Sequence, residues 1–172
     1  MHGITRRDWM LAAACWTHVL RGQTSSPRFA YFDPATAGEI EAIADTIIPG
    51  DETPGAREAG VIWFIDGALA GYDKDQREIY RKGLADTERK RADLFPGSQS
   101  IAGLTSEQRI TLLKAVEDTG FFVAVRRHTI LGFFGHPKYG GNRHSAASRL
   151  LGIETATHFQ PPFGYYDQEL EK

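Results

Sequence analysis

The sequence predicts an all-α protein, a single multihelical domain of about five helices with irregular N- and C-terminal extensions. Two observations predict this class. Apolar residues recur three and four positions apart in the long segments between residues 33 and 134, as they do along one face of a helix. Alternating strand patterns and hairpin signals are missing from the sequence. The unequal helices and long connections favour a multihelical array over a regular four-helix bundle.

Terminal signals bound the first two helices. Asp33 is a candidate N-cap with a proline directly after it, and Pro49 with the following glycine stops the isoleucine-rich helix between them. After a turn at residues 51–55, apolar residues again recur at helical intervals. We therefore expect a second helix over residues 56–69.

The remaining three helices differ strongly in character. A charged, solvated helix is expected over residues 73–94, and Thr105 with Gln108 forms a capping box that begins a fourth helix, which Gly120 interrupts. Residues 121–134 are dense in aromatic and β-branched side chains, so a strand is the alternative there, but the length favours a buried helix. The inward face of the charged helix is expected to comprise Ile79, Tyr80, Leu84 and Ala85.

The N-terminus carries a pattern typical of an export signal. Arg6 and Arg7 precede a short apolar run, which resembles a twin-arginine signal read by a receptor that exports folded proteins. We interpret residues 1–22 as this signal and residues 23–32 as a polar linker. The alternative is an ordinary helix start capped by Thr5. The apolar run is shorter than the roughly 20 residues that span a bilayer.

Two aromatic segments that cannot be regular helix follow the last long helix. Residues 132–142 hold four glycines and a proline, and Gly140-Gly141-Asn142 tolerates left-handed backbone. Residues 159–172 form an extended aromatic arm beyond a helical domain at 33–158; such an arm needs a surface to lie on, either its own domain or a partner. The candidate partner interface is His136, Pro137, Tyr139, Gly140, Gly141, Asn142, Phe163, Tyr165 and Tyr166.

Composition restricts the cofactor chemistry. The net charge is −2, which gives no electrostatic case for nucleic acid. Cys15 is the only cysteine, so an internal disulfide and a cysteine-held metal cluster are both excluded. A second hypothesis remains open, a small independent metal-dependent periplasmic enzyme that uses a C-terminal histidine cluster. It predicts that His136, His144 and His158 converge, and Glu154 with His158 has a spacing that can chelate a metal.

Three stretches together resemble the gluconate 2-dehydrogenase subunit 3 family. Residues 43–49 read IADTIIP and continue to TPGAREAGV at 53–61, residues 121–122 are FF followed by Arg126 and Thr129, and residues 132–142 read GFFGHPKYGGN. The last stretch is the most specific. The chain departs from the family where a Gly-Trp pair commonly follows, because Ala147 and Ser148 occupy that place.

The resemblance implies an accessory role. Members are small periplasmic subunits without catalytic residues of their own, which bind a large FAD-bearing subunit of the glucose–methanol–choline type, often together with a cytochrome c subunit that carries haem c. It therefore implies that this chain binds, stabilises and helps to export the large subunit of a sugar-, gluconate- or glucoside-oxidising complex. It also implies that the chain holds no cofactor itself and meets the membrane only through the complex.

Overall fold

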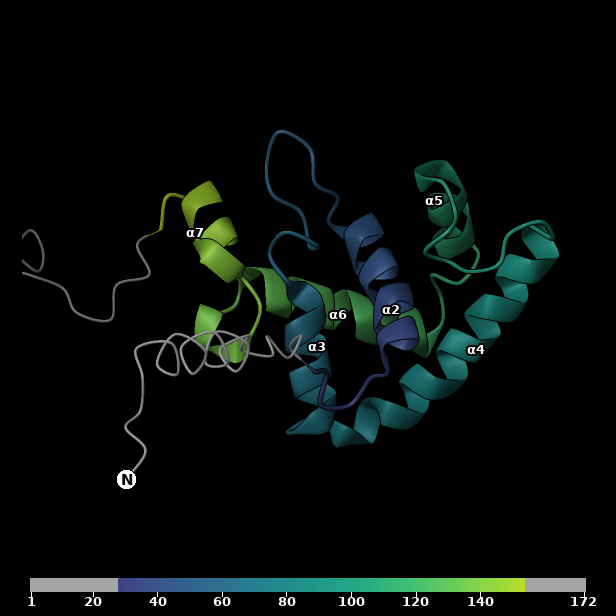
Figure 1. Cartoon of the computed structure of the whole chain (residues 1–172), viewed down its shortest axis with the longest axis horizontal. Helices are drawn as coiled ribbons and strands as arrows, with labels where there is room; N and C mark the ends of the chain where they lie inside the picture. The colour runs from purple at the N-terminus through teal and green to yellow at the C-terminus, as the bar shows by residue number, and fades with distance from the viewer. Residues whose placement is uncertain (1–27, 154–172) are drawn as a thin grey trace, which may run out of the picture.

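The computed structural model describes residues 28–153, and every regular element there is helical (Figure 1). The all-α prediction is confirmed for this part of the chain. The predicted signal with Arg6 and Arg7, and the predicted arm with Phe163, Tyr165 and Tyr166, lie outside the described residues. The elements in order are α2 Pro34–Ile47, α3 Val61–Ala70, η1 Lys74–Gln76, α4 Arg77–Leu94, α5 Ser106–Lys114, α6 Gly120–Phe134, η2 Pro137–Tyr139, η3 Arg143–Ser145 and α7 Ala146–Leu150.

Helix α6 is the centre of the domain. It packs against α2, α3, α4 and α7, and in Figure 1 it runs behind α3 and α2 while α4 crosses diagonally towards α5. Segment 121–134 is therefore a helix and not the alternative strand. Its buried face meets a continuous apolar core, whose largest fully buried aliphatic side chains are Ile40, Ile43, Ile65, Leu69, Ile101 and Leu112.

The predicted caps form as expected. The Asp33 carboxylate accepts hydrogen bonds from the backbone N–H groups of Ala35 and Thr36, which would otherwise have no partner in the first turn of α2. Thr105 and Gln108 bond reciprocally at the start of α5, the Gln108 N–H to the Thr105 hydroxyl and the Thr105 N–H to the Gln108 side chain. Both helix starts follow from local sequence.

The second predicted helix begins later than expected. Residues 56–60 form a turn, and α3 begins only at Val61. Gly60 has left-handed backbone at φ 64°, which interrupts a helix, and the Ala56 N–H bonds to the carbonyl of Ile48, the residue that caps the end of α2. A backbone bond across the preceding turn and a left-handed residue thus replace the first helical turn that the apolar spacing predicted.

The charged helix also departs from expectation. It starts with the short 3₁₀ turn η1, and α4 proper runs from Arg77. Tyr80 is buried and Leu84 half-buried as predicted, but Ile79 and Ala85 are exposed. The buried stripe of α4 is narrow, with Tyr80, Thr87 and Arg91 one or two turns apart, so the residues beside it turn to solvent.

Within residues 28–153, a sixth α-helix, α7, adds to the five expected. It follows three non-glycine residues with left-handed backbone, Asn142, His144 and Ser145, which reverse the chain after η2. No helix within residues 28–153 combines the length and the hydropathy needed to cross a membrane.

Candidate partner-binding site

The predicted interface loop leaves the C-terminal end of α6. His136 accepts a hydrogen bond from the Lys138 N–H through its Nδ1 atom and so begins η2, with Pro137 in the first turn. Tyr139 projects into solvent with 58% of its surface exposed, and the Lys138 ammonium lies 4.9 Å from the centre of its ring. The loop therefore presents an imidazole and a tyrosine ring at the surface.

Gly141 and Asn142 of the loop are buried, and Gly140 is half-buried. Gly140 has left-handed backbone at φ 100°, and a Cβ on Gly141 would collide with the carbonyl oxygen of Gly132 in α6. Such close backbone contact admits only glycine at position 141. Gly141 is buried against α6, so the exposed part of the predicted loop interface is the surface of His136 and Tyr139.

Asn142 is the internal anchor of this loop. Its side chain is buried; Nδ2 donates to the Gly135 carbonyl at 2.9 Å and to the Ser148 hydroxyl at 3.1 Å. Its Oδ1 atom accepts the Ala147 N–H of α7 at 2.9 Å. One amide thus joins the end of α6 to the start of α7, which positions Tyr139 between them. Of the three residues that tolerate left-handed backbone, Gly140 and Asn142 adopt it and Gly141 does not; φ of Asn142 is 45°.

A buried carboxylate holds the segment that precedes the domain. Asp66 of α3 accepts three backbone N–H groups, those of Ala30 at 2.7 Å and of Tyr31 and Phe32 at 2.9 Å each. Residues 28–32, named the pre-helical segment here, are thereby fixed although they were predicted to be linker. Sequence reasoning missed this role, because an aspartate inside an apolar helix was the only local signal.

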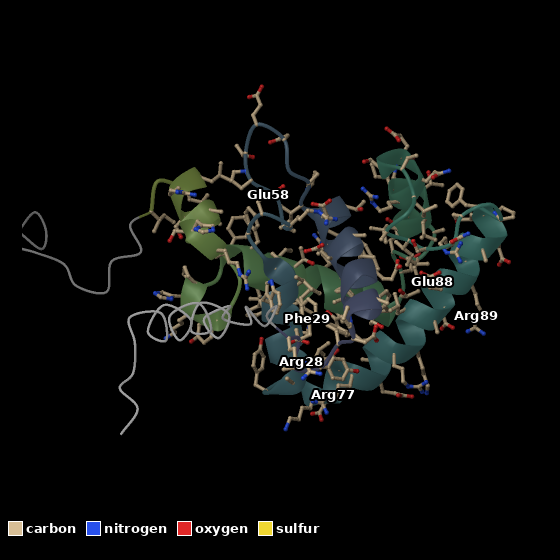
Figure 2. All side chains as sticks on the ribbon, viewed as in Figure 1. Arg28, Phe29, Glu58, Arg77, Glu88 and Arg89 are labelled. Carbon is tan, nitrogen blue, oxygen red and sulfur yellow. The ribbon has the colours of Figure 1, made fainter. Side chains whose placement is uncertain are left out.

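Aromatic contacts complete the attachment of the pre-helical segment. Phe29 stacks on Trp63 of α3 with ring centres 4.3 Å apart. Arg77 lies over the Tyr31 ring at 4.9 Å while its Nε atom donates to the Leu69 carbonyl at 2.7 Å, near the end of α3. Figure 2 shows Phe29 and Arg77 together at the foot of α3, where α4 begins. The chain N-terminal to residue 28 is thus attached to a firmly held point of the domain.

A hydrogen-bonded chain of three side chains lies under α4. The Tyr80 hydroxyl is 2.8 Å from Nδ1 of His128, and Nε2 of His128 is 2.8 Å from the Asp73 carboxylate, which also pairs with Arg127. Because an ionised carboxylate only accepts, Nε2 carries the proton and Nδ1 accepts from the tyrosine. Burial lowers the pKa of His128 below its ordinary value despite the opposing effect of Asp73, and burial raises the pKa of Tyr80.

This chain of side chains is suited to structure and not to catalysis. His128 is fully buried and both of its ring nitrogens are occupied, so it cannot reach a substrate. The sequence pattern assigns His128 no role, because its two partners are 48 and 55 residues away along the chain.

The lowered pKa of His128 predicts a pH dependence of stability. In the unfolded chain this histidine takes up its proton near its ordinary pKa of 6.5, whereas the folded chain resists it. The contribution of the neutral His128 to the free energy of unfolding is therefore fully present above pH 6.5. It is lost as the pH falls from 6.5 towards the pKa of His128 in the folded chain. Urea unfolding at pH 7.5 and pH 5.5 should show a larger loss for the wild type than for His128→Gln. Equal losses would contradict the prediction, because the other histidines are common to both proteins.

Possible metal ligands do not gather in the part of the chain that the structure describes. Within residues 28–153, no three histidine, cysteine, aspartate or glutamate side chains come together in a way that could hold a metal ion. His128 is engaged with Tyr80 and Asp73, and His158 and Glu154 of the predicted cluster lie outside the described residues.

A groove of about 420 Å³ separates α2 from α4. Its walls are mostly apolar, and the buried Tyr80 ring lies at its base. Asp33, Arg81 and Glu88 stand among the lining residues; Figure 2 labels Glu88 on α4. No histidine, cysteine or serine lines the groove, so it offers a place for an apolar group without a nucleophile.

Comparison with protein-family models decides the family. The model described as gluconate 2-dehydrogenase subunit 3 matches residues 35–149, about two thirds of the chain. The chain belongs to the gluconate 2-dehydrogenase subunit 3 family. The resemblance drawn from the three sequence stretches is thus confirmed. No curated protein and no solved structure matches the chain.

The family match coincides with the folded domain. It begins in the first turn of α2 and ends in α7, and so contains the core, the Asp73–His128–Tyr80 chain and the loop around Asn142. The predicted signal segment at 1–22 and the predicted arm at 159–172 fall outside the matched residues. A member of the gluconate 2-dehydrogenase subunit 3 family is, by that description, a subunit of a gluconate dehydrogenase complex, which implies a larger catalytic partner.

Proposed function

We propose that this chain is the non-catalytic small subunit of a periplasmic sugar-, gluconate- or glucoside-oxidising complex. It binds and stabilises a large FAD-dependent dehydrogenase subunit of the glucose–methanol–choline type and assists its export. FAD resides in that large subunit, and haem c, where a third subunit is present, resides in a cytochrome c. The single observation that carries the proposal is the family match over the whole helical domain.

The arrangement of the chain supports this role. The imidazole and tyrosine chemistry of His136 and Tyr139 is displayed on a loop that Asn142 fixes from inside, as a binding surface requires. Buried polar side chains hold the fold together, as Asp66 and His128 do. Tyr139 and, on the arm, Phe163, Tyr165 and Tyr166 are candidate anchors for the partner.

Co-expression tests the proposal directly. The full chain, tagged at its C-terminus, is produced together with a candidate large flavoprotein subunit from the same organism, purified through the tag and examined for flavin absorbance. We expect a stoichiometric yellow complex and little active flavoprotein when this chain is omitted. A colourless chain, together with a flavoprotein that is folded, exported and active alone, would refute the proposal.

The export role has its own control. Arg6→Lys together with Arg7→Lys weakens a twin-arginine signal without changing the charge. We expect both proteins to stay in the cytoplasm in this double variant while the complex still forms there. If the flavoprotein reached its normal periplasmic level in the double variant, the proposed export role would be wrong and only the binding role would stand.

A further inference from the structure

Helix α6 carries apolar side chains on two faces, of which only one is buried. The buried face is formed by residues such as Phe121, Val125 and Phe133. On the opposite face, beside the exposed Arg126 and Arg127, four large apolar side chains recur at helical spacing and are 40–60% exposed: Val123, Ile130, Leu131 and Phe134. A group of exposed apolar side chains with a polar border is typical of a protein-binding surface, and this open face is named the α6 outer face here.

The α6 outer face continues onto two neighbouring helices. One hollow of about 360 Å³ lies along α6 itself, and a second of about 250 Å³ lies between α6, α5 and α2. Both are lined by Glu117, Phe122 and Arg126, so they adjoin. Ile110 of α5, 46% exposed, and Ile47 of α2 extend the apolar lining of the second hollow. The α6 outer face and its two hollows therefore extend over three helices. Hollows of this kind receive protruding side chains of a partner.

Charge on the α6 outer face is mainly positive. Arg126 is exposed and forms no ion pair with any residue of 28–153, and Lys114 lines the same hollow. Arg127 is already paired with Asp73, and Glu117 is the one acidic side chain in the two linings. Basic side chains around apolar hollows are complementary in charge to a partner surface on which carboxylates surround protruding apolar side chains.

We infer that the α6 outer face docks on the large dehydrogenase subunit, against an apolar surface bordered by carboxylates. The inference rests on the proposed function and adds the surface to it. The face lies within the matched residues 35–149, whereas the arm at 159–172 lies outside them, so the face belongs to the part of the chain that defines a dehydrogenase subunit. A second copy fits less well, because a two-fold interface would place this mainly positive face against the same mainly positive face of the other copy.

The test uses two isoleucines with the same exposure. Ile130 on the α6 outer face is 40% exposed, and Ile79 on α4 is 38% exposed and lines neither hollow. In the full-length chain, Ile130→Glu should weaken binding to the flavoprotein at least tenfold by surface plasmon resonance, whereas Ile79→Glu should change it less than twofold. Arg126→Glu should also weaken binding, and its affinity should rise with added salt, opposite to the wild type.

The outcomes separate the inference from the proposed function. If the wild type forms no complex, the proposed function itself fails. If it forms a complex that Ile130→Glu and Arg126→Glu leave unchanged, the function stands and the α6 outer face is not the docking surface. The melting temperature of the isolated chain gives a further outcome. If Ile130→Glu lowers it and Ile79→Glu does not, the chain's own arm covers the face. A dimer of the isolated chain that Ile130→Glu dissociates would assign the face to a second copy; both results overturn the inference.

Discussion

Replacing His128 with alanine is expected to lower the free energy of unfolding by about 3–4 kcal/mol. The substitution leaves the buried Tyr80 hydroxyl without its acceptor, removes a donor from Asp73 and opens a cavity beside the fully buried ring. Each of these losses acts in the same direction, because an unpaired buried polar group costs more than its hydrogen bond contributed. Urea unfolding followed by circular dichroism at pH 7.5 measures the change.

A tyrosine pair supplies the matched control for the His128 prediction. Tyr80→Phe removes only the hydroxyl that His128 accepts and should cost about 1–2 kcal/mol. Tyr139→Phe removes the same group from an exposed ring and should stay within about 0.5 kcal/mol of the wild type. If the two variants had equal stability, the buried hydrogen-bonded chain would contribute nothing, and the role assigned to His128 would be wrong.

Asp66→Asn is expected to destabilise the domain by about 2–3 kcal/mol. The side chain keeps its size, but the three backbone N–H groups of the pre-helical segment lose a charged acceptor. An amide can present only one oxygen, so its NH₂ group would face the Ala30 N–H or the pair from Tyr31 and Phe32. Denaturant unfolding gives the energy, and amide hydrogen exchange at residues 30–32 shows whether the segment detaches.

Asp93→Asn is the control for Asp66. Asp93 is exposed near the end of α4, and its replacement should change stability by less than about 0.5 kcal/mol. Faster exchange at residues 30–32 in Asp66→Asn alone would establish that this carboxylate holds the segment. Identical exchange in both variants would mean that the Phe29–Trp63 stack and the Arg77–Tyr31 contact suffice without it.

The buried hydrogen bonds of His128 and Asp66 stabilise the domain without a partner, which bears on the proposed function. The proposed export route accepts folded proteins, so it would require this domain to fold before transport. Asp66 ties residues 30–32, which follow the predicted signal segment, onto α3. The surfaces that would meet the partner, Tyr139 and the α6 outer face, lie on the same domain but use other residues. Stability and binding can therefore be changed separately by substitution.

The candidate site was predictable only in part. The glycine-rich loop at 132–142 was identified as special from composition, and left-handed backbone at Gly140 and Asn142 follows from residue types that tolerate it. Composition did not reveal that Asn142 turns inward to bond α7, because that depends on where α7 lies. The two apolar faces of α6 also look alike in sequence, and only packing shows which one is covered.

The sequence by itself determined the helical class, the capped starts of α2 and α5 and the family, because these depend on residues within a few positions of one another. Tertiary structure decided the late start of α3, the exposure of Ile79 and the open face of α6. It also joined Tyr80 and Asp73 to His128 across 48 and 55 residues. The physical reason is that burial and long-range hydrogen bonds depend on which helices meet, and no local pattern of apolar spacing records that.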